Sequence, residues 1–122
     1  MPVPVLKRGH VLIAAVQDAL TDTDWQELRT NVVRRAGEVR AKGVIIDVSA
    51  MDVMDSYATR VLDGIARMLR YRGADTVVVG VQPGVALAMA QLGLRLSSAG
   101  TALDLDEGFD ELDRRAAARS LL

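Results

Sequence analysis

The stretch VIIDVSAMDVMDSYATRVL, residues 44–62, decides the fold class. Its first five residues form a run that is β-branched except for Asp47 and shows no alternation, which is typical of a strand buried on both faces of a sheet. From about Ser56 to Arg70 the spacing predicts a helix, closed by Gly73. We assign its apolar face to Val61, Leu62, Ile65, Met68 and Leu69. A buried strand that leads into such a helix predicts an α/β domain with helices packed on a sheet.

The chain before this stretch predicts two strands and one helix. Apolar runs at 3–6 and 10–16 are separated by the turn residue Gly9, so we expect a hairpin or adjacent strands, with His10 in the second strand. Thr23, followed by Gln26, fits a capping box for the next helix. That helix has an apolar face and should stop at Gly43. The face consists of Trp25, Leu28, Val32, Ala36 and Val39.

The chain after this stretch continues the alternation. It predicts a buried strand at 76–81, a helix at 83–92 with Pro first and Gly after its end, and a short strand at 101–103. Asp104 should cap a last helix, whose Ala/Arg-rich tail, 114–122, is expected to fray. The order is therefore β-β-α-β-α-β-α-β-α. It predicts one domain over 1–122, with a small mixed sheet of about five strands and about four helices.

Composition excludes several kinds of function. The 122 residues contain no cysteine and a single histidine, so disulfides, thiol catalysis and zinc–thiolate sites are ruled out, and we expect no metal and no cofactor. Fifteen basic residues balance sixteen acidic ones and aromatic residues are few, which argues against nucleic-acid binding. No apolar run reaches the length of a membrane span, so we expect a cytoplasmic protein.

Enzymatic motifs are also missing from the sequence. No phosphate loop of the GxxxxGK[ST] or GxGxxG type occurs and no GxSxG elbow, and residues 80–84 read as a strand–helix turn. We therefore expect a protein that is not an enzyme. One alternative is a phosphoaspartate receiver domain with Asp47 as acceptor. A receiver needs an acidic pair after its first strand and a lysine after its last, but this chain offers Asp18 alone, and its lysines are Lys7 and Lys42.

The loop at 47–59 is the strongest candidate site. Acids and serines crowd it, and apolar residues stand where polar ones are usual in a connection. Asp55 or Ser56 is the natural N-cap of the helix that follows, a role worth about 1 kcal/mol. A hydroxyl at a helix N-terminus also tolerates an added phosphate, because free amides and the helix dipole favour negative charge. The two roles are compatible.

Three stretches together resemble the STAS domain of anti-sigma-factor antagonists. They are residues 44–62 with DSYATRVL, 78–92 with VGVQPGVA, and 101–108 with TALDLDEG, and the resemblance covers nearly the whole chain. Free antagonists usually continue the motif as Asp-Ser-Ser/Thr-Gly, whereas Tyr57 and Ala58 stand here. This departure favours the short scaffold subunit of the bacterial stressosome over the free antagonist.

The resemblance implies a phosphorylatable serine, here Ser56, with Thr59 and Ser49 as lesser candidates. It implies an RsbT-like serine kinase, a PP2C-type phosphatase and RsbR-like STAS paralogues as partners. The implied function is a non-enzymatic switch that holds the kinase until Ser56 is phosphorylated, the alternative being a free antagonist of an anti-sigma kinase. From the acids and apolar residues of the loop at 47–59 we expect the docking residues to be Asp52, Val53, Met54, Asp55, Ser56 and Tyr57. We also expect a homo- or hetero-oligomer, because apolar residues lie outside the predicted core, among them Met51, Val53, Met54 and Leu94.

Overall fold

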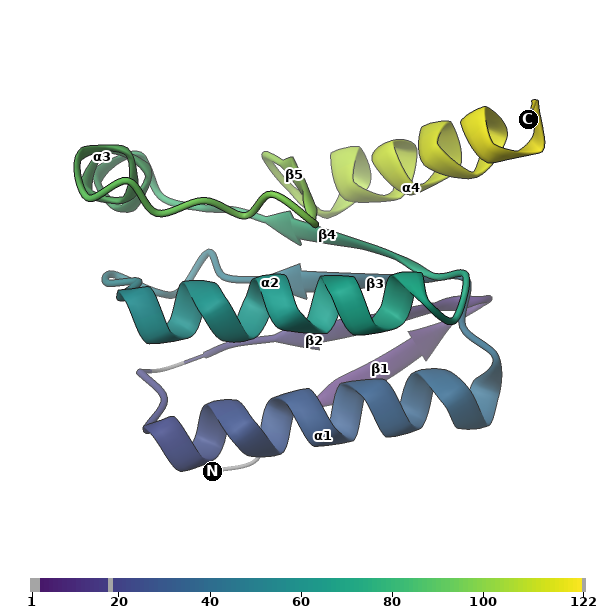
Figure 1. Ribbon diagram of the computed structural model, residues 1–122, viewed down its shortest axis with the longest axis horizontal. Coiled ribbons are helices and arrows are strands. Elements are labelled where there is room, and N and C mark those ends of the chain that lie inside the picture. The colour runs from purple at the N-terminus through teal and green to yellow at the C-terminus, as the bar shows by residue number, and fades with distance from the viewer. Residues whose placement is uncertain (1–2, 18, 122) are drawn as a thin grey trace.

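The computed structural model describes residues 3–17 and 19–121, and it contains one mixed sheet with four helices (Figure 1). The strands are β1 (Val5–Arg8), β2 (Val11–Ala15), β3 (Gly43–Asp47), β4 (Asp75–Val79) and β5 (Gly100–Ala102). The helices are α1 (Asp22–Val39), α2 (Ser56–Arg70), α3 (Pro83–Gln91) and α4 (Leu105–Ser120). The predicted order β-β-α-β-α-β-α-β-α and the α/β class are confirmed.

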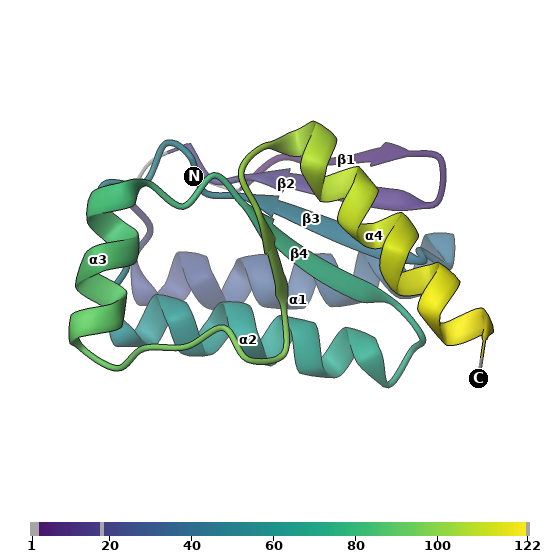
Figure 2. The ribbon, with the colours of Figure 1, turned by 90° about the horizontal axis from the view of Figure 1, so that it is seen from above.

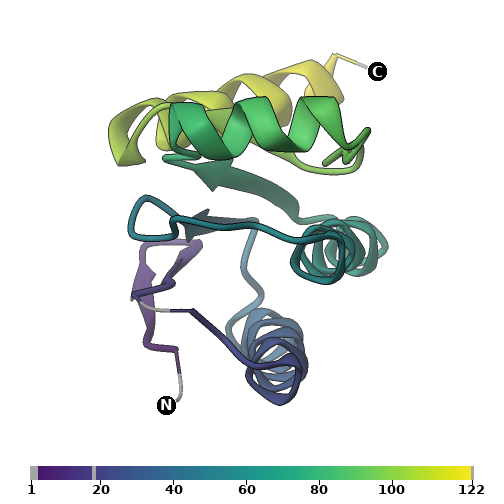
Figure 3. The same ribbon diagram turned by 90° about the vertical axis from the view of Figure 1, so that its left-hand side faces the viewer.

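The strands lie in the spatial order β1-β2-β3-β4-β5, with β1 antiparallel to β2 and the other pairs parallel. Helices α1 and α2 pack on one face of this sheet and α4 on the other, while α3 lies beyond the carboxyl end of β4 (Figures 2 and 3). The β3–α2 and β4–α3 connections therefore emerge at the same end of the sheet, because β3 and β4 run in parallel.

The two faces of the sheet bury cores of different size. The larger core joins α1 and α2 to the sheet and includes the fully buried Val32, Leu62 and Ile65. The smaller core lies under α4, where Leu112 packs with Ile45. Since β3 and β4 contribute to both cores, their side chains need no polar face. This explains the unbroken apolar runs in the sequence.

Helix α1 begins two residues earlier than predicted. Its N-cap is Thr21: the Thr21 hydroxyl accepts from the backbone N–H of Asp24 at 3.1 Å, and the Asp24 carboxylate accepts from the Thr21 backbone N–H at 3.0 Å. This second bond lowers the pKa of Asp24. The predicted Thr23–Gln26 box was therefore wrong. An ionised carboxylate is a stronger acceptor than the Gln26 amide, so the Thr21–Asp24 capping box forms in preference to the overlapping Thr23–Gln26 box.

The end of α1 also differs from the prediction. The helix stops at Val39, and Arg40 adopts the left-handed conformation with φ 51 that a glycine usually supplies. Gly43 is instead the first residue of β3. A Cβ there would lie 2.8 Å from a methyl carbon of Leu112, so α4 can approach the sheet only because this position is glycine.

Three further residue assignments are corrected. His10 is an exposed turn residue next to Gly9, and its carbonyl accepts from the Lys42 backbone N–H at 2.8 Å. Met68 is 37% exposed and is not part of the α2 core face. Met51 is buried in the larger core, so its apolar side chain is not surplus.

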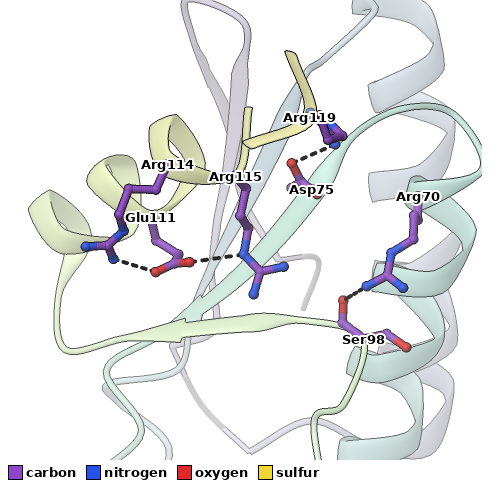
Figure 4. Close-up of polar contacts among 7 residues, drawn as sticks. All are labelled: Arg70, Asp75, Ser98, Glu111, Arg114, Arg115 and Arg119. Atoms are coloured by element: carbon purple, nitrogen blue, oxygen red, sulfur yellow. Dashed lines mark hydrogen bonds and ion pairs between the residues drawn. The ribbon is translucent and has the colours of Figure 1, made fainter. Parts of the chain in front are cut away.

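The C-terminal segment continues α4 as far as Ser120, and its fraying remains a prediction; Leu122 lies outside the described residues. Figure 4 shows that Glu111 pairs with Arg114 and Arg115, and that Arg119 reaches Asp75 on β4 at 2.7 Å. The hydrogen bond from Arg114 holds the pKa of Glu111 below its usual range. Among the described residues, no helix is both long and apolar enough to cross a membrane.

Candidate functional site at the start of helix α2

The connection from β3 to α2 sorts its side chains into an inner and an outer set. Met51 and Met54 are 6% and 5% exposed and pack in the larger core, whereas Val53 is 75% exposed. Asp52 also faces outward. The predicted docking role of Met54 is therefore wrong for its side chain, which the core occupies. The outward-facing side chains are thus one acid, Asp52, and one apolar residue, Val53, and they lie a few residues before Ser56.

Asp55 takes the capping role at α2. Its Oδ1 accepts from the backbone N–H of Ala58 at 2.8 Å, and the residue has the extended backbone of an N-cap. Ser56 is therefore the first helical residue, and its side chain is exposed. Since Asp55 already caps the helix, the Ser56 hydroxyl is not needed for that purpose.

Tyr57 lies at the seam between α1 and α2. Its hydroxyl accepts a hydrogen bond from the Gln26 amide at 3.0 Å, and the guanidinium of Arg60 lies 5.9 Å from the centre of its ring. The ring is half-buried. Tyr57 thus links the first turn of α2 to α1 and lies next to the exposed Ser56.

The two lesser phosphoacceptor candidates differ in accessibility. Thr59 is 3% exposed, and its hydroxyl donates to the Asp55 carbonyl at 2.9 Å, so a kinase could not reach it without opening the first turn of α2. Ser49 is exposed in the loop after β3, and its backbone N–H donates to Asp47 at 2.9 Å. Ser56 and Ser49 are the accessible hydroxyls of the predicted site.

Sequence reasoning missed Gln82, which joins the two neighbouring connections. Its side-chain amide donates to the Ser49 carbonyl at 2.8 Å and to Asp52 at 3.3 Å. It precedes Pro83 as the N-cap of α3 but makes no side-chain capping bond. The residue order offers no signal for this contact, because it depends on β3 and β4 being neighbours in the sheet.

A groove borders Ser56 on the side of α2 that faces the segment after α3. It has a volume of about 500 Å³ and runs between the first half of α2 and the segment after α3, and we call it the Ser56 groove. Its lining residues are Ser56, Thr59, Arg60, Asp63, Arg67, Gly93, Leu94 and Arg95. Three arginines therefore line the same groove as the candidate hydroxyl. The spacing of four between Ser56 and Arg60 could have predicted one of them, but nothing local to Arg95 could.

The phosphoaspartate alternative depends on Asp47 as acceptor and on further acidic side chains that would hold a metal ion. Asp47 at the end of β3 is half-buried and accepts from the backbone N–H of Ser49. Within residues 3–17 and 19–121, no group of three or more acidic, histidine or cysteine side chains could hold a metal ion. Asp18, the acid that a receiver would need, lies outside the described residues.

Residues 3–108 match the model of the STAS domain family. The chain belongs to the STAS domain family. This confirms the resemblance seen in the sequence, and it shows that the receiver alternative was wrong. A search of curated proteins found no match.

Solved structures narrow the relationship. A Moorella thermoacetica RsbS variant with a serine-to-glutamate substitution is 34% identical, with a TM-score of 0.80 over 94% of this chain and 97% of that one. A chain from a structure of the stressosome, described there as a signal integration and transduction hub, is also 34% identical, with a TM-score of 0.77 over 93% and 98%. Unphosphorylated SpoIIAA, an anti-sigma factor antagonist, shares the fold at 15% identity, with a TM-score of 0.72 over 91% and 96%. This chain is a STAS protein of the anti-sigma-factor antagonist and stressosome group.

Proposed function

We propose that this chain is a non-enzymatic phospho-switch and scaffold of a stressosome-type complex. In its unmodified form it holds an RsbT-like serine kinase, and phosphorylation of Ser56 releases that kinase. The observation that carries the proposal is the exposed Ser56 hydroxyl at the first position of α2, where Asp55 has taken over capping. If the Ser56 hydroxyl served only as a helix cap, it would accept a capping hydrogen bond from the backbone, as Asp55 does here from Ala58.

The proposed switch acts through charge. The kinase transfers the γ-phosphoryl group of ATP: a bond forms from Ser56 Oγ to phosphorus, the bond to ADP breaks, and the hydroxyl proton passes to a base of the kinase. The phosphate adds about −1.5 to −2 charges. Asp52 and Asp55, both exposed, are already negative on this surface. Like-charge repulsion and desolvation then weaken the docked kinase, with Val53 as its exposed apolar contact.

Its other proposed partners are RsbR-like STAS paralogues and a PP2C-type phosphatase that resets Ser56. The 34% identity to RsbS and to a stressosome chain supports the scaffold over the free antagonist, which is represented by SpoIIAA at 15%. The exposed Leu87, Leu92 and Leu103 offer apolar surface for assembly in place of the buried Met51 and Met54. Sedimentation alone and with an RsbR-like partner tests this; a strict monomer that ignores the partner favours the free antagonist.

Phosphorylation itself is tested by mass spectrometry after incubation with the RsbT-like kinase. We expect the phosphate on Ser56, no phosphate on the Ser56→Ala variant, and normal labelling of Ser49→Ala, the matched control at the other exposed serine. Wild-type labelling of Ser56→Ala would refute the assignment.

Kinase capture is tested by calorimetry with the same partner. Ser56→Asp should bind the kinase about tenfold more weakly, since a cost of about 1.4 kcal/mol changes the dissociation constant tenfold. Ser56→Ala should bind like the wild type. Equal affinities of wild type, Ser56→Ala and Ser56→Asp would place the switch elsewhere.

A further inference from the structure

The Ser56 groove has an excess of positive charge. Arg60, Arg67 and Arg95 line it, against the single acid Asp63. That acid is already engaged, because it accepts from the Ser98 backbone N–H at 2.7 Å and lies 3.8 Å from the Arg67 guanidinium. The local charge therefore favours an anion.

Two of these arginines are available to such an anion. The Arg60 guanidinium lies 5.9 Å from the centre of the Tyr57 ring, and among residues 3–17 and 19–121 it makes no side-chain hydrogen bond. Within the part of the chain that the structure describes, neither Arg60 nor Arg95 forms an ion pair with an acidic side chain. Both side chains are exposed.

The fold places these arginines on opposite walls of the groove. Ser56 and Arg60 are one helical turn apart on α2, so their side chains lie on the same face. Arg95 belongs to the connection between α3 and β5. This connection is already tied to α2, because Arg70 donates to the Ser98 carbonyl at 2.8 Å (Figure 4). A phosphate on Ser56 would thus stand between a helix and a neighbouring loop.

We propose that phosphoserine at position 56 is bound by its own chain, through Arg60 and Arg95. The inference rests on the proposed function and adds to it a second consequence of phosphorylation. The ion pairs fix the segment 92–99 against α2, so the modification changes the surface at α3 as well as at the kinase-docking face. Arginine suits this role because its guanidinium pairs with two phosphate oxygens at once.

The test measures the second pKa of the phosphate by ³¹P NMR on protein with phosphoserine installed at position 56 by genetic-code expansion. Phosphoserine ordinarily has a second pKa of about 6, and a bound guanidinium lowers it. We expect Arg60→Gln and Arg95→Gln each to raise that pKa by about 0.15–0.7 unit, the range expected for exposed ion pairs. Arg34→Gln, an exposed arginine of α1 paired with Glu38, is the control and should leave the pKa unchanged.

Other charges near the phosphate are the same in every variant. Asp52, Asp55 and Asp63 raise its pKa, and Arg67 lowers it, so differences between variants report Arg60 and Arg95 alone. A pKa that neither Arg60→Gln nor Arg95→Gln changes would overturn the inference, provided thermal melts show folded protein. Because no kinase takes part, this failure is distinct from that of the proposed function, which would appear as a kinase that does not label Ser56.

Discussion

Two connections leave neighbouring strands of the sheet and lead into helices, yet they are built differently. The β3–α2 connection, residues 48–55, is long, sends two methionines into the core and ends in a side-chain cap at Asp55. The β4–α3 connection, residues 80–82, is short and ends without a side-chain cap, with Pro83 opening the helix. They touch where Gln82 donates to the Ser49 carbonyl.

The two connections therefore have different roles: the β4–α3 connection supports its neighbour, and the β3–α2 connection exposes the candidate site. The short connection has no spare hydroxyl or acid, and its polar side chain is used to hold its neighbour. The long connection anchors itself by buried apolar residues and caps its helix with one residue, so the next residue, Ser56, is left exposed. A segment anchored in this way can change its surface charge without losing its position.

Substitution of Met54, the buried methionine that anchors the long connection, should have the largest effect on the free energy of unfolding. Met54→Ala removes a side chain that is 5% exposed and should lower the free energy of unfolding by about 2–4 kcal/mol. Val53→Ala, one residue earlier and 75% exposed, should change it by less than about 0.5 kcal/mol while weakening kinase capture. Urea denaturation measures both. Equal costs would mean that the connection is not sorted into inner and outer sides.

Disruption of the contact between the two connections should have the next largest effect on the free energy of unfolding. Gly80 has φ +80, and a Cβ there would lie 2.8 Å from the Ser49 Cβ. Gly80→Ala should therefore cost about 2 kcal/mol of unfolding free energy, from backbone strain and displacement of the loop after β3. The control is Gly84→Ala in the first turn of α3, where nothing lies within 4 Å and a small stabilisation is expected. If thermal melts rank the two variants equally, the close approach of the connections has no energetic weight.

The N-cap of α2 contributes less. Asp55→Ala leaves the Ala58 backbone N–H without its partner and should cost about 1 kcal/mol. Gln82→Ala at the N-cap of α3 loses no capping bond, only its two exposed contacts with the other connection, and should cost about half as much. Chemical denaturation under identical conditions compares them. A larger cost for Gln82→Ala would reverse the roles that we assign to the two connections.

Local signals explain what the sequence could predict. The bounds of α2, Ser56–Arg70, follow from the acidic cap before it and Gly73 after it, and the unbroken apolar runs of β3 and β4 follow from burial on both faces. The position of Ser56 at the start of α2 could be predicted because a helix start depends on neighbours in the chain, whereas its phosphorylation stays a prediction.

Other features depend on contacts between distant residues. An irregular loop has no period, so nothing in the sequence could tell that Met54 points inward and Val53 outward. Overlapping capping boxes at Thr21 and Thr23 were equally plausible until hydrogen-bond strength decided between them. The approach of Arg95 to α2 depends on the path of the segment after α3, which no local pattern specifies.

The smallest expected effect is that of a charge at Ser56 on stability, and it tests whether the long connection really separates presentation from support. Helix α2 has no acidic residue in its first turn, so the aspartate of Ser56→Asp gains about 0.3–1 kcal/mol from the helix dipole. Repulsion from Asp52 and Asp55 offsets this gain, and the net change should stay within about 0.5 kcal/mol. Thermal melts of wild type, Ser56→Ala and Ser56→Asp at low and high salt measure it, since salt screens both contributions. A loss of more than about 1 kcal/mol would mean that charge at this position loosens the first turn of α2, and that the kinase would then be released by a change in the fold of the site rather than by the charge on its surface.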